Sequence, residues 1–520
     1  MAWPSVSDDH PLDCGACKST GSEGEEGLTN SVPFAIGAEP HCPLHAVVLG
    51  DRMRILGPLL AILGVLVALS AMAEPPANHT SAGQIAAEFL AAFNGGDRPA
   101  YEGYLRDHWP GFKDAVDYAE LRAQSGGFDV VSRTPGSDTA QQEVVKARLA
   151  DDFQTFEVEV GPGPGHPIQR LSFTSADRPA SIPAPTRVPP AQIGRLVDAE
   201  LAAMGDFSGA VLVAREGRPI YSRAEGFADR AHGVRNTAQT RFRIASMGKM
   251  FTAVAILQLS QARKLDLDAT VGSILTEYPN AEFGRGVTVR QLLTHTGGAG
   301  DFMSKLWADN YLRLNTPADY IALFGGRSPA FKPGSRFDYA NYGFIVLGRM
   351  VEVVSGESYE DYLRAHIFEP AGMFSSGLNA PPIEASQLAT SYVKTVDGYG
   401  PPPPPFQGAA TPAGGAYTTV GDLLAFANAL DGWRLLDRKH TQLLLAPKVK
   451  GDDGEYAFGF EVRDTNGVND VGHDGGGPGE NGGLRILNKG EVTVIALSNV
   501  APTWRANWLC EYIAARIRVQ

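Results

Sequence analysis

Hydrophobic positions in residues 80–175 first follow helical spacing and then alternate with polar ones. In SAGQIAAEFLAAFNGG, the residues Ile85, Phe89, Leu90 and Phe93 lie on one side of a helix that ends at a glycine pair. The segments FDVVSRT, EVVKARL and TFEVEVG then alternate, which is typical of antiparallel strands with one buried face. The pattern predicts a small α+β domain over 80–175. Because no group of residues in it suggests chemistry, we expect it to act as a spacer or a binding accessory.

A second, longer region of mixed periodicity runs from 193 to 520, after a proline-rich segment at 176–192. The proline-rich segment predicts an extended, semi-rigid linker. The long region opens with the helical pattern IGRLVDAELAAM and a hairpin pattern around Glu-Gly-Arg-Pro. It closes with the hairpin pattern GGLRILNKGEVTVIALSNV and a helical stretch at about 503–519. We expect the two hairpins to pair into one sheet flanked by the first and last helices, with a helix-rich segment between them.

A short apolar run at 55–69 follows Arg54 and precedes the small-residue sequence Ala-Met-Ala. This is the pattern of a secretory signal peptide, and the run is shorter than the ~20 residues that span a bilayer. We therefore predict a signal peptide at 53–73 and an exported protein, periplasmic or secreted; an uncut membrane anchor is the alternative. Because signal peptides stand at the N-terminus, we expect translation to start at Met53 and residues 1–52 to be a non-native extension.

Composition narrows the functional classes. Hydrophobic residues make up 43% and charged residues 20% of the 520 positions, as in soluble globular proteins. The formal net charge of −13 argues against nucleic acid as a partner, since phosphate binding needs clustered Lys and Arg. Cys14 and Cys17 have the spacing of half a zinc site, but a structural zinc would need two more ligands. The 11 histidines show no paired-ligand spacing, so we expect no metal and no other cofactor.

The sequence Ser-Met-Gly-Lys at 246–249 is a Ser-x-x-Lys motif at the start of a helical pattern. A second Ser-x-x-Lys at 391–394 has no helical continuation, so its serine and lysine need not meet. The segment MFTAVAILQLSQARKL predicts a buried helix after Lys249, and residues three apart on a helix lie on one face. We therefore expect the Ser246 hydroxyl to lie near the Lys249 amine. A lysine whose pKa is lowered by burial can then remove the hydroxyl proton.

Two further motifs follow this serine along the chain. Tyr-Ala-Asn at 339–341 lies in SRFDYANYGF, where a tyrosine can relay a proton and an asparagine can orient a lysine and a substrate amide. His-Asp-Gly at 473–475 opens HDGGGPGENGGLRIL, where glycines before a strand let the backbone approach a substrate closely.

SMGK, YAN and HDG in this order resemble the three-motif set of serine β-lactamases and penicillin-binding proteins. The branch with class C β-lactamases, D-alanyl-D-alanine carboxypeptidases and esterases is similar in using Tyr-x-Asn, where others use Ser-Asp-Asn. The phrases FRIASMGKMFTAVAILQL, VTVRQLLTHTGG and AGGAYTTVGDLLAFANAL extend the resemblance over about 200–500. It implies a β-lactamase-like α+β fold for 193–520, an α/β/α sandwich with an antiparallel sheet plus a helical subdomain. The region 80–175 resembles, by pattern alone, NTF2- and cystatin-like domains.

The resemblance also implies roles for individual residues. Ser246 attacks a carbonyl as nucleophile, Lys249 accepts its proton, and Tyr339 helps to pass that proton to the leaving group. Backbone N–H groups form the oxyanion hole that stabilises the developing negative charge. The expected substrate-binding and orienting residues are Asn341, His473 and Gly475, and the expected oxyanion-hole residues are Ser246 and Gly476.

The third motif departs from the Lys-Thr-Gly of penicillin-binding proteins and most β-lactamases. His473 is a weaker cation than lysine near neutral pH, and the next residue, Asp474, is an anion. Both changes weaken the expectation of a substrate carboxylate at this motif. His295 in LLTHTGG and Glu369 in FEPAGM are expected to be structural rather than catalytic.

We therefore predict a serine hydrolase that cleaves an ester or amide, β-lactams and D-amino-acid peptides included, through an acyl-serine intermediate. Its partner is a small-molecule or peptide substrate, and peptidoglycan-derived peptides are one source of such substrates. The alternative function is a non-catalytic penicillin-recognising module that binds peptidoglycan or acts as a sensor. A pure binding module has no need of Ser246, Lys249 and Tyr339 together, which favours the enzyme.

Overall fold

The computed structural model describes residues 81–109, 125–148, 153–162, 166–176, 178–379, 387–395, 398–407, 410–451, 454–501 and 505–519. The predicted signal peptide, the N-terminal extension before it and the Cys14–Cys17 pair lie outside these residues. Among the helices of the described ranges, none has the length and apolar character needed to cross a membrane.

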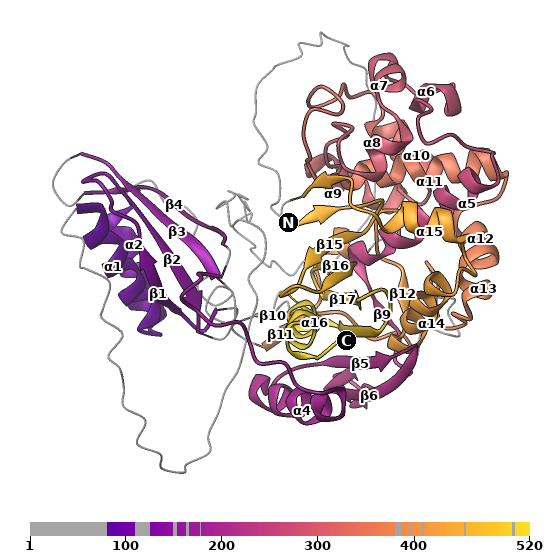
Figure 1. Ribbon diagram of the computed structural model, residues 1–520. Coiled ribbons are helices and arrows are strands. Elements are labelled where there is room, and N and C mark those ends of the chain that lie inside the picture. Colours follow the sequence, from indigo (N-terminus) through magenta and orange to yellow (C-terminus); the bar gives the residue numbers. More distant parts are fainter. Residues whose placement is uncertain are drawn as a thin grey trace, which may run out of the picture.

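The first unit is a four-stranded antiparallel sheet with two helices on one face (Figure 1). Its strands pair in chain order, each with the next. Stacked aromatic side chains, Phe89 and Phe93 from the helix and Phe156 and Phe173 from the sheet, form a core of their own. The helix and the three strands expected from the sequence are present. The elements are α1 (Ser81–Asn94), α2 (Arg98–His108), β1 (Phe128–Arg133), β2 (Ala140–Ala147), β3 (Phe153–Val160) and β4 (Ile168–Ser175).

The second unit contains an eight-stranded antiparallel sheet. Strands β18 and β5 are buried along their length or nearly so, because both faces of the sheet are covered. These two strands pair with each other, which confirms that the terminal hairpins share one sheet. The spatial order is β13 (Val449–Lys450), β14 (Glu455–Tyr456), β15 (Glu461–Asp464), β16 (Asn469–Gly477), β17 (Glu480–Leu487), β18 (Val492–Ser498), β5 (Gly209–Arg215) and β6 (Arg218–Glu225).

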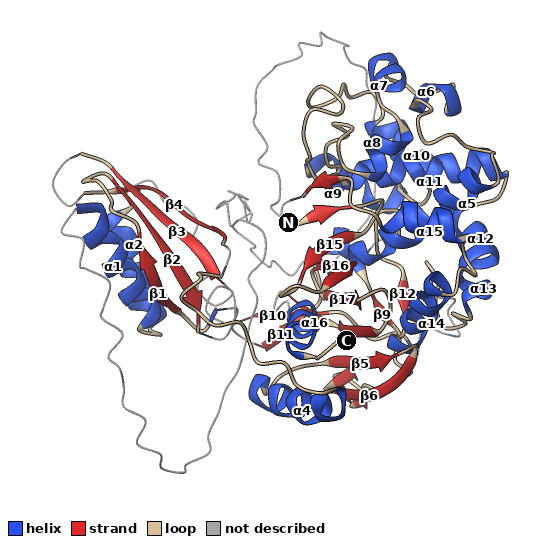
Figure 2. Cartoon of the chain, viewed as in Figure 1, coloured by secondary structure: helices blue, strands red, loops and turns tan. Residues whose placement is uncertain are grey.

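One face of this sheet is covered by the first and last helices of the unit, α4 (Ile193–Met204) and α16 (Arg505–Arg516). Their apolar side chains, such as Val197 and Ile513, pack with the valines of β5 and β18. This arrangement confirms the expected flanking helices. Figure 2 shows the sheet between these two helices and the larger helical part of the molecule.

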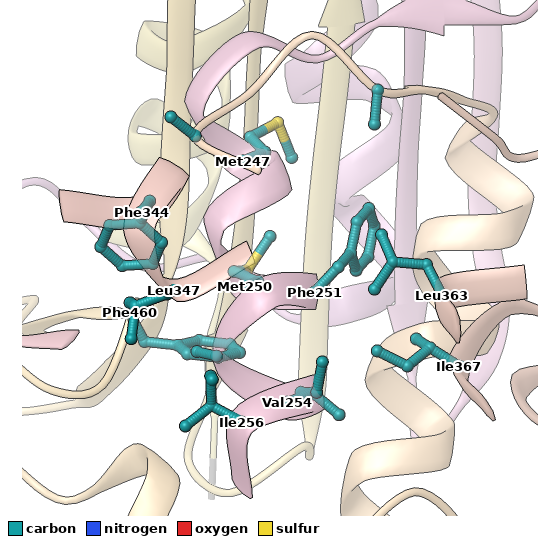
Figure 3. Close-up of a cluster of buried hydrophobic side chains, with 14 of the residues drawn as sticks. Met247, Met250, Phe251, Val254, Ile256, Phe344, Leu347, Leu363, Ile367 and Phe460 are labelled. Carbon is teal, nitrogen blue, oxygen red and sulfur yellow. The ribbon is translucent and has the colours of Figure 1, made fainter. Parts of the chain in front are cut away.

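The other face of the sheet is covered by the helical region built around α5 (Lys249–Gln261), α11 (Asn341–Ser355) and α14 (Val420–Asp431). Helix α5 is apolar on all sides and is enclosed by side chains of neighbouring elements, including Phe344, Leu363 and Phe460 (Figure 3). A helix buried all round is a rigid support for the residues at its N-terminal end.

Shorter elements complete the second unit. The helices are α6 (Val271–Ile274), α7 (Ala281–Gly286), α8 (Val289–Leu293), α9 (Lys305–Asn310), α10 (Pro317–Phe324), α12 (Tyr359–Leu363), α13 (Glu369–Ala371) and α15 (Arg438–Leu445). The tight 3₁₀ turns are η1 (Pro190–Gln192), η2 (Ala245–Gly248), η3 (Tyr311–Arg313) and η6 (Pro404–Gln407), and η4 (Arg364–Phe368) is a wider π-helical turn. The short strands are β7 (Phe227–Asp229), β8 (Val234–Arg235), β9 (Phe242–Arg243), β10 (Tyr392–Thr395), β11 (Gly398–Gly400), β12 (Tyr417–Thr418) and β19 (Val500–Ala501).

Candidate active site

Ser246 lies in the tight turn η2, immediately before helix α5 begins at Lys249. The sequence predicted a helix start here, and the structure differs only in the tighter 3₁₀ geometry of this first turn. Ser246 is buried, and the Nζ atom of Lys249 donates a hydrogen bond to its Oγ atom at 3.1 Å. The serine and lysine of the motif therefore meet, as the three-residue spacing predicted.

The amine of Lys249 is fully enclosed by the protein. Besides Ser246 it donates to Oδ1 of Asn341 at 2.7 Å and to the backbone carbonyl of Ala413 at 2.6 Å. Burial disfavours the charged form and lowers the pKa of Lys249 to about 7, against the opposing effect of the Asp301 and Glu461 carboxylates. A large share of this lysine is thus neutral near physiological pH, which a proton acceptor requires.

The second motif stands at the start of helix α11. Asn341 is the first residue of that helix and is buried, whereas the side chain of Tyr339 is half-buried. The Nζ atom of Lys249 lies 4.8 Å from the centroid of the Tyr339 ring. The structure thus brings Tyr339 and Asn341 to the same lysine from one short segment.

Asp301 is a member of the site that the sequence analysis missed. Its Oδ2 atom accepts a hydrogen bond from Nδ2 of Asn341 at 2.7 Å. Its Oδ1 atom accepts the backbone N–H groups of Phe302 and Met303. The carboxylate therefore fixes which way the Asn341 amide points and leaves Oδ1 of that amide toward Lys249. The available signal was an acidic residue directly after the glycine-containing loop that follows LLTHT.

The third motif lies on strand β16, whose residues alternate between the two faces of the sheet. His473 and Gly475 face the helical region. A side chain at Gly475 would place its Cβ 2.2 Å from the carbonyl oxygen of Ile244, so the strand approaches the serine turn as only glycine permits. Gly476, expected in the oxyanion hole, follows on the same strand and pairs with Asn481.

Asp474 points to the opposite face, away from Ser246. Its carboxylate lies 2.6 Å from Arg485 and 3.2 Å from Arg463. The expectation that Asp474 places a negative charge at the substrate is therefore wrong, because strand alternation turns it toward two guanidinium groups.

His473 is completely buried, and both of its ring nitrogens meet protein groups. Nε2 lies 3.1 Å from the hydroxyl of Tyr456, and Nδ1 contacts the carbonyl oxygen of Asp474. The structure places His473 beside the site, and groups of the protein itself are the hydrogen-bond partners of its two ring nitrogens.

His295 contacts the second motif through a hydrogen bond and a ring contact. It takes a left-handed backbone conformation, φ +55°, in the turn after α8. Its Nδ1 atom accepts the backbone N–H of Ala340, and its ring stacks on Tyr339 with centroids 4.3 Å apart. Burial holds the pKa of His295 well below its usual value, with the Lys249 charge acting in the same direction. This geometry fits the structural role expected for it.

The second Ser-x-x-Lys motif does not form a comparable pair. Lys394 lies on strand β10 and forms an ion pair with Asp206. Ser391, just before that strand, packs against Gly479 at the β16–β17 turn. In the described part of the chain, no cluster of three His, Cys, Asp or Glu residues is arranged to hold a metal ion.

Three features define a serine hydrolase of the β-lactamase type: a buried serine in the turn before an enclosed helix, a buried lysine whose pKa is lowered, and a glycine-containing strand beside them. The chain belongs to the Beta-lactamase family, whose model matches residues 195–508. The fold expected from the resemblance is confirmed.

Relatives of several named activities share this region. Penicillin-binding protein 4 of Amycolatopsis lactamdurans is 30% identical over 312 residues, which cover 56% of this chain and 80% of the relative. Esterase EstB of Burkholderia gladioli is 32% identical over 259 residues, covering 43% and 65%. The crystal structure of a penicillin-binding protein from Bacillus halodurans covers 63% of this chain and 99% of its own, with 30% identity and a TM-score of 0.54. The chain is a serine hydrolase of this family; its place in the class C branch stays a prediction.

Proposed function

We propose that this hydrolase cleaves esters or amides through an acyl-enzyme on Ser246, with Lys249 as the base. The observation that carries the proposal is the buried Lys249 amine, 3.1 Å from the serine oxygen and with a pKa lowered to about 7. A serine hydroxyl needs such a base, and an ordinary exposed lysine would be protonated and unable to act.

The proton follows a short path in this proposal. Lys249 takes the proton as Ser246 Oγ bonds to the substrate carbonyl carbon, and the negative charge on the carbonyl oxygen is met by the N–H groups of Ser246 and Gly476. Collapse of this intermediate breaks the bond to the leaving group, which receives the proton with the help of Tyr339. Asn341 holds Lys249 in place. Water then attacks the acyl-enzyme and releases the acid.

Covalent labelling tests the proposal directly. A fluorophosphonate probe should modify Ser246, located by mass spectrometry of the labelled peptide, and Ser246→Ala should lose both labelling and turnover while keeping its fold. Ser391→Ala is the matched control, because that serine belongs to the second Ser-x-x-Lys motif and does not approach its lysine in this way. Labelling that persists in Ser246→Ala would overturn the assignment.

A substrate panel then separates the activities of the relatives. Matched p-nitrophenyl esters, a chromogenic cephalosporin and D-amino-acid peptides, including peptidoglycan-derived ones, cover the classes that the names of the relatives suggest. Stable labelling by penicillin without turnover of any member of the panel would favour a sensor instead.

We also propose that the enzyme is exported through the signal peptide at 53–73, and that 80–175 and 193–520 are separate domains joined by the linker at 176–192. The separate hydrophobic cores of the two units support the division. N-terminal sequencing of the exported protein tests the cleavage, and a retained segment 1–52 would contradict it.

A further inference from the structure

Three buried side chains form a continuous hydrogen-bonded chain beside the candidate site. His295 follows α8, Tyr456 lies on β14 and His473 lies on β16. The Nε2 atom of His295 is 3.1 Å from the Tyr456 hydroxyl, and this hydroxyl is 3.1 Å from Nε2 of His473. One tyrosine oxygen therefore meets a nitrogen of each histidine.

The two ends of the chain fix the direction of its hydrogen bonds. At one end the backbone N–H of Ala340 must donate to Nδ1 of His295, so the neutral ring carries its proton on Nε2 and donates it to Tyr456. At the other end the carbonyl of Asp474 can only accept, so Nδ1 of His473 carries the proton there. Nε2 of a neutral His473 is then an acceptor, and the hydroxyl proton of Tyr456 points at it.

The carboxylate that lies near His473 is already paired with two arginines. The carboxylate of Glu461 is 3.9 Å from Nδ1 of His473 and by itself would favour a charged ring. That carboxylate already meets Arg463 at 2.6 Å and Arg485 at 3.5 Å. His473 has no exposed area, so water cannot solvate a second positive charge on its ring. A second proton on His473 would place two N–H donors on the Tyr456 oxygen and would remove Nε2 as the acceptor of the hydroxyl proton.

We propose that Tyr456 is a specificity-determining positioning residue, which holds His473 neutral and engaged so that the site takes esters or amides without a carboxylate at the third motif. In relatives with Lys-Thr-Gly the corresponding residue is a cation. Here both ring nitrogens of His473 are hydrogen-bonded to groups of the protein. This inference rests on the proposed acyl-enzyme chemistry and names the class of substrate for it.

Tyr456→Phe tests the proposal because it removes the hydroxyl and keeps the ring. The probes are a phenyl ester and a 3-carboxyphenyl ester of the same N-acylglycine, with rates corrected for spontaneous hydrolysis. For the full-length wild type we expect kcat/KM for the phenyl ester to exceed that for the 3-carboxyphenyl ester by about tenfold or more. This difference is the scale of one charge-assisted hydrogen bond. In Tyr456→Phe, Nε2 of His473 loses the hydroxyl that donates to it and can carry a proton toward the carboxylate, so the ratio should fall about tenfold.

Tyr221→Phe is the matched control, since it removes a tyrosine hydroxyl bonded to Asp198 on the far side of the sheet and should leave the ratio unchanged. An equal loss for both esters in a folded Tyr456→Phe, or a wild type that prefers the carboxylate ester, would overturn the proposal. Absence of fluorophosphonate labelling at Ser246 would instead overturn the proposed function.

Imidazole nitrogen NMR of the wild type gives a test that does not depend on the folding of Tyr456→Phe. With the His473 resonances identified by their loss in His473→Gln, we expect a protonated Nδ1 and an unprotonated Nε2 at neutral pH. A ring with protons on both nitrogens would contradict the inference.

Discussion

A guanidinium nitrogen of Arg485 lies 2.6 Å from Oδ1 of Asp474, behind the strand that carries the third motif. Both side chains are buried, and Glu511 of helix α16 lies 3.2 Å from the same guanidinium. The pair is part of a cluster of two arginines and four carboxylates that joins β15, β16, β17 and α16. The position of His473 and Gly475 beside Ser246 thus depends on charges that face away from the substrate.

Arg485→Met should destabilise the protein strongly. Removing one partner of a buried ion pair leaves uncompensated charge, and we expect a loss of about 3–5 kcal/mol in the free energy of unfolding. Urea denaturation followed by circular dichroism measures this loss. The exposed pair of Arg364 with Asp361 provides the control, because Arg364→Met should leave the unfolding midpoint almost unchanged. Similar midpoints for the two variants would contradict the structural role of the cluster.

The sequence predicted the parts of this molecule that carry a local pattern. The helices at α1 and α4, the terminal hairpins and the meeting of Ser246 with Lys249 all follow from spacing along the chain. The short strands β13 and β14 were missed, because a strand of two residues is too short to show an alternating pattern. Tyr456 was missed with them, and it joins His295 to His473 through tertiary contacts between distant segments.

Asp474 also shows that the sequence did not predict the tertiary contacts of a residue. Its negative charge was expected at the substrate, but the identity of a motif residue does not say which face of the strand that residue occupies. The paired register of β16 with β17 and the positions of Arg463 and Arg485 decide that its charge is neutralised away from the site.

The dependence of kcat/KM on pH should report the protonation of Lys249. The lysine can accept the serine proton only when neutral, so activity should rise as pH increases through about 7 and reach a plateau above it. Initial rates with a neutral ester across this range measure the midpoint. An acidic limb close to the pKa of an ordinary lysine, three units higher, would show that burial does not control this group.

Asp301→Asn should move that midpoint to lower pH. The Asp301 carboxylate raises the pKa of Lys249, so its removal favours the neutral lysine at a more acidic pH. Activity at the plateau should also fall, because an Asn side chain cannot accept hydrogen bonds through both atoms from Asn341 and the two backbone N–H groups. Asp309→Asn changes an exposed acid paired with Lys305 and should leave the pH profile in place. An unshifted midpoint in Asp301→Asn would separate Asp301 from the charge of Lys249.

Gly475→Ala should abolish most of the activity, whereas Gly477→Ala on the same strand should be tolerated. A Cβ at position 475 would lie 2.2 Å from the carbonyl oxygen of Ile244, two residues before the nucleophile, and backbone must move to relieve that contact. A shift of about 1 Å in a catalytic group can reduce kcat/KM by about 100-fold. At position 477 the same Cβ meets no atom within 4 Å, so the ester activity and the unfolding midpoint should stay close to the wild type. Equal activities of the two variants would show that the close approach of β16 to the serine turn does not determine the geometry of the site.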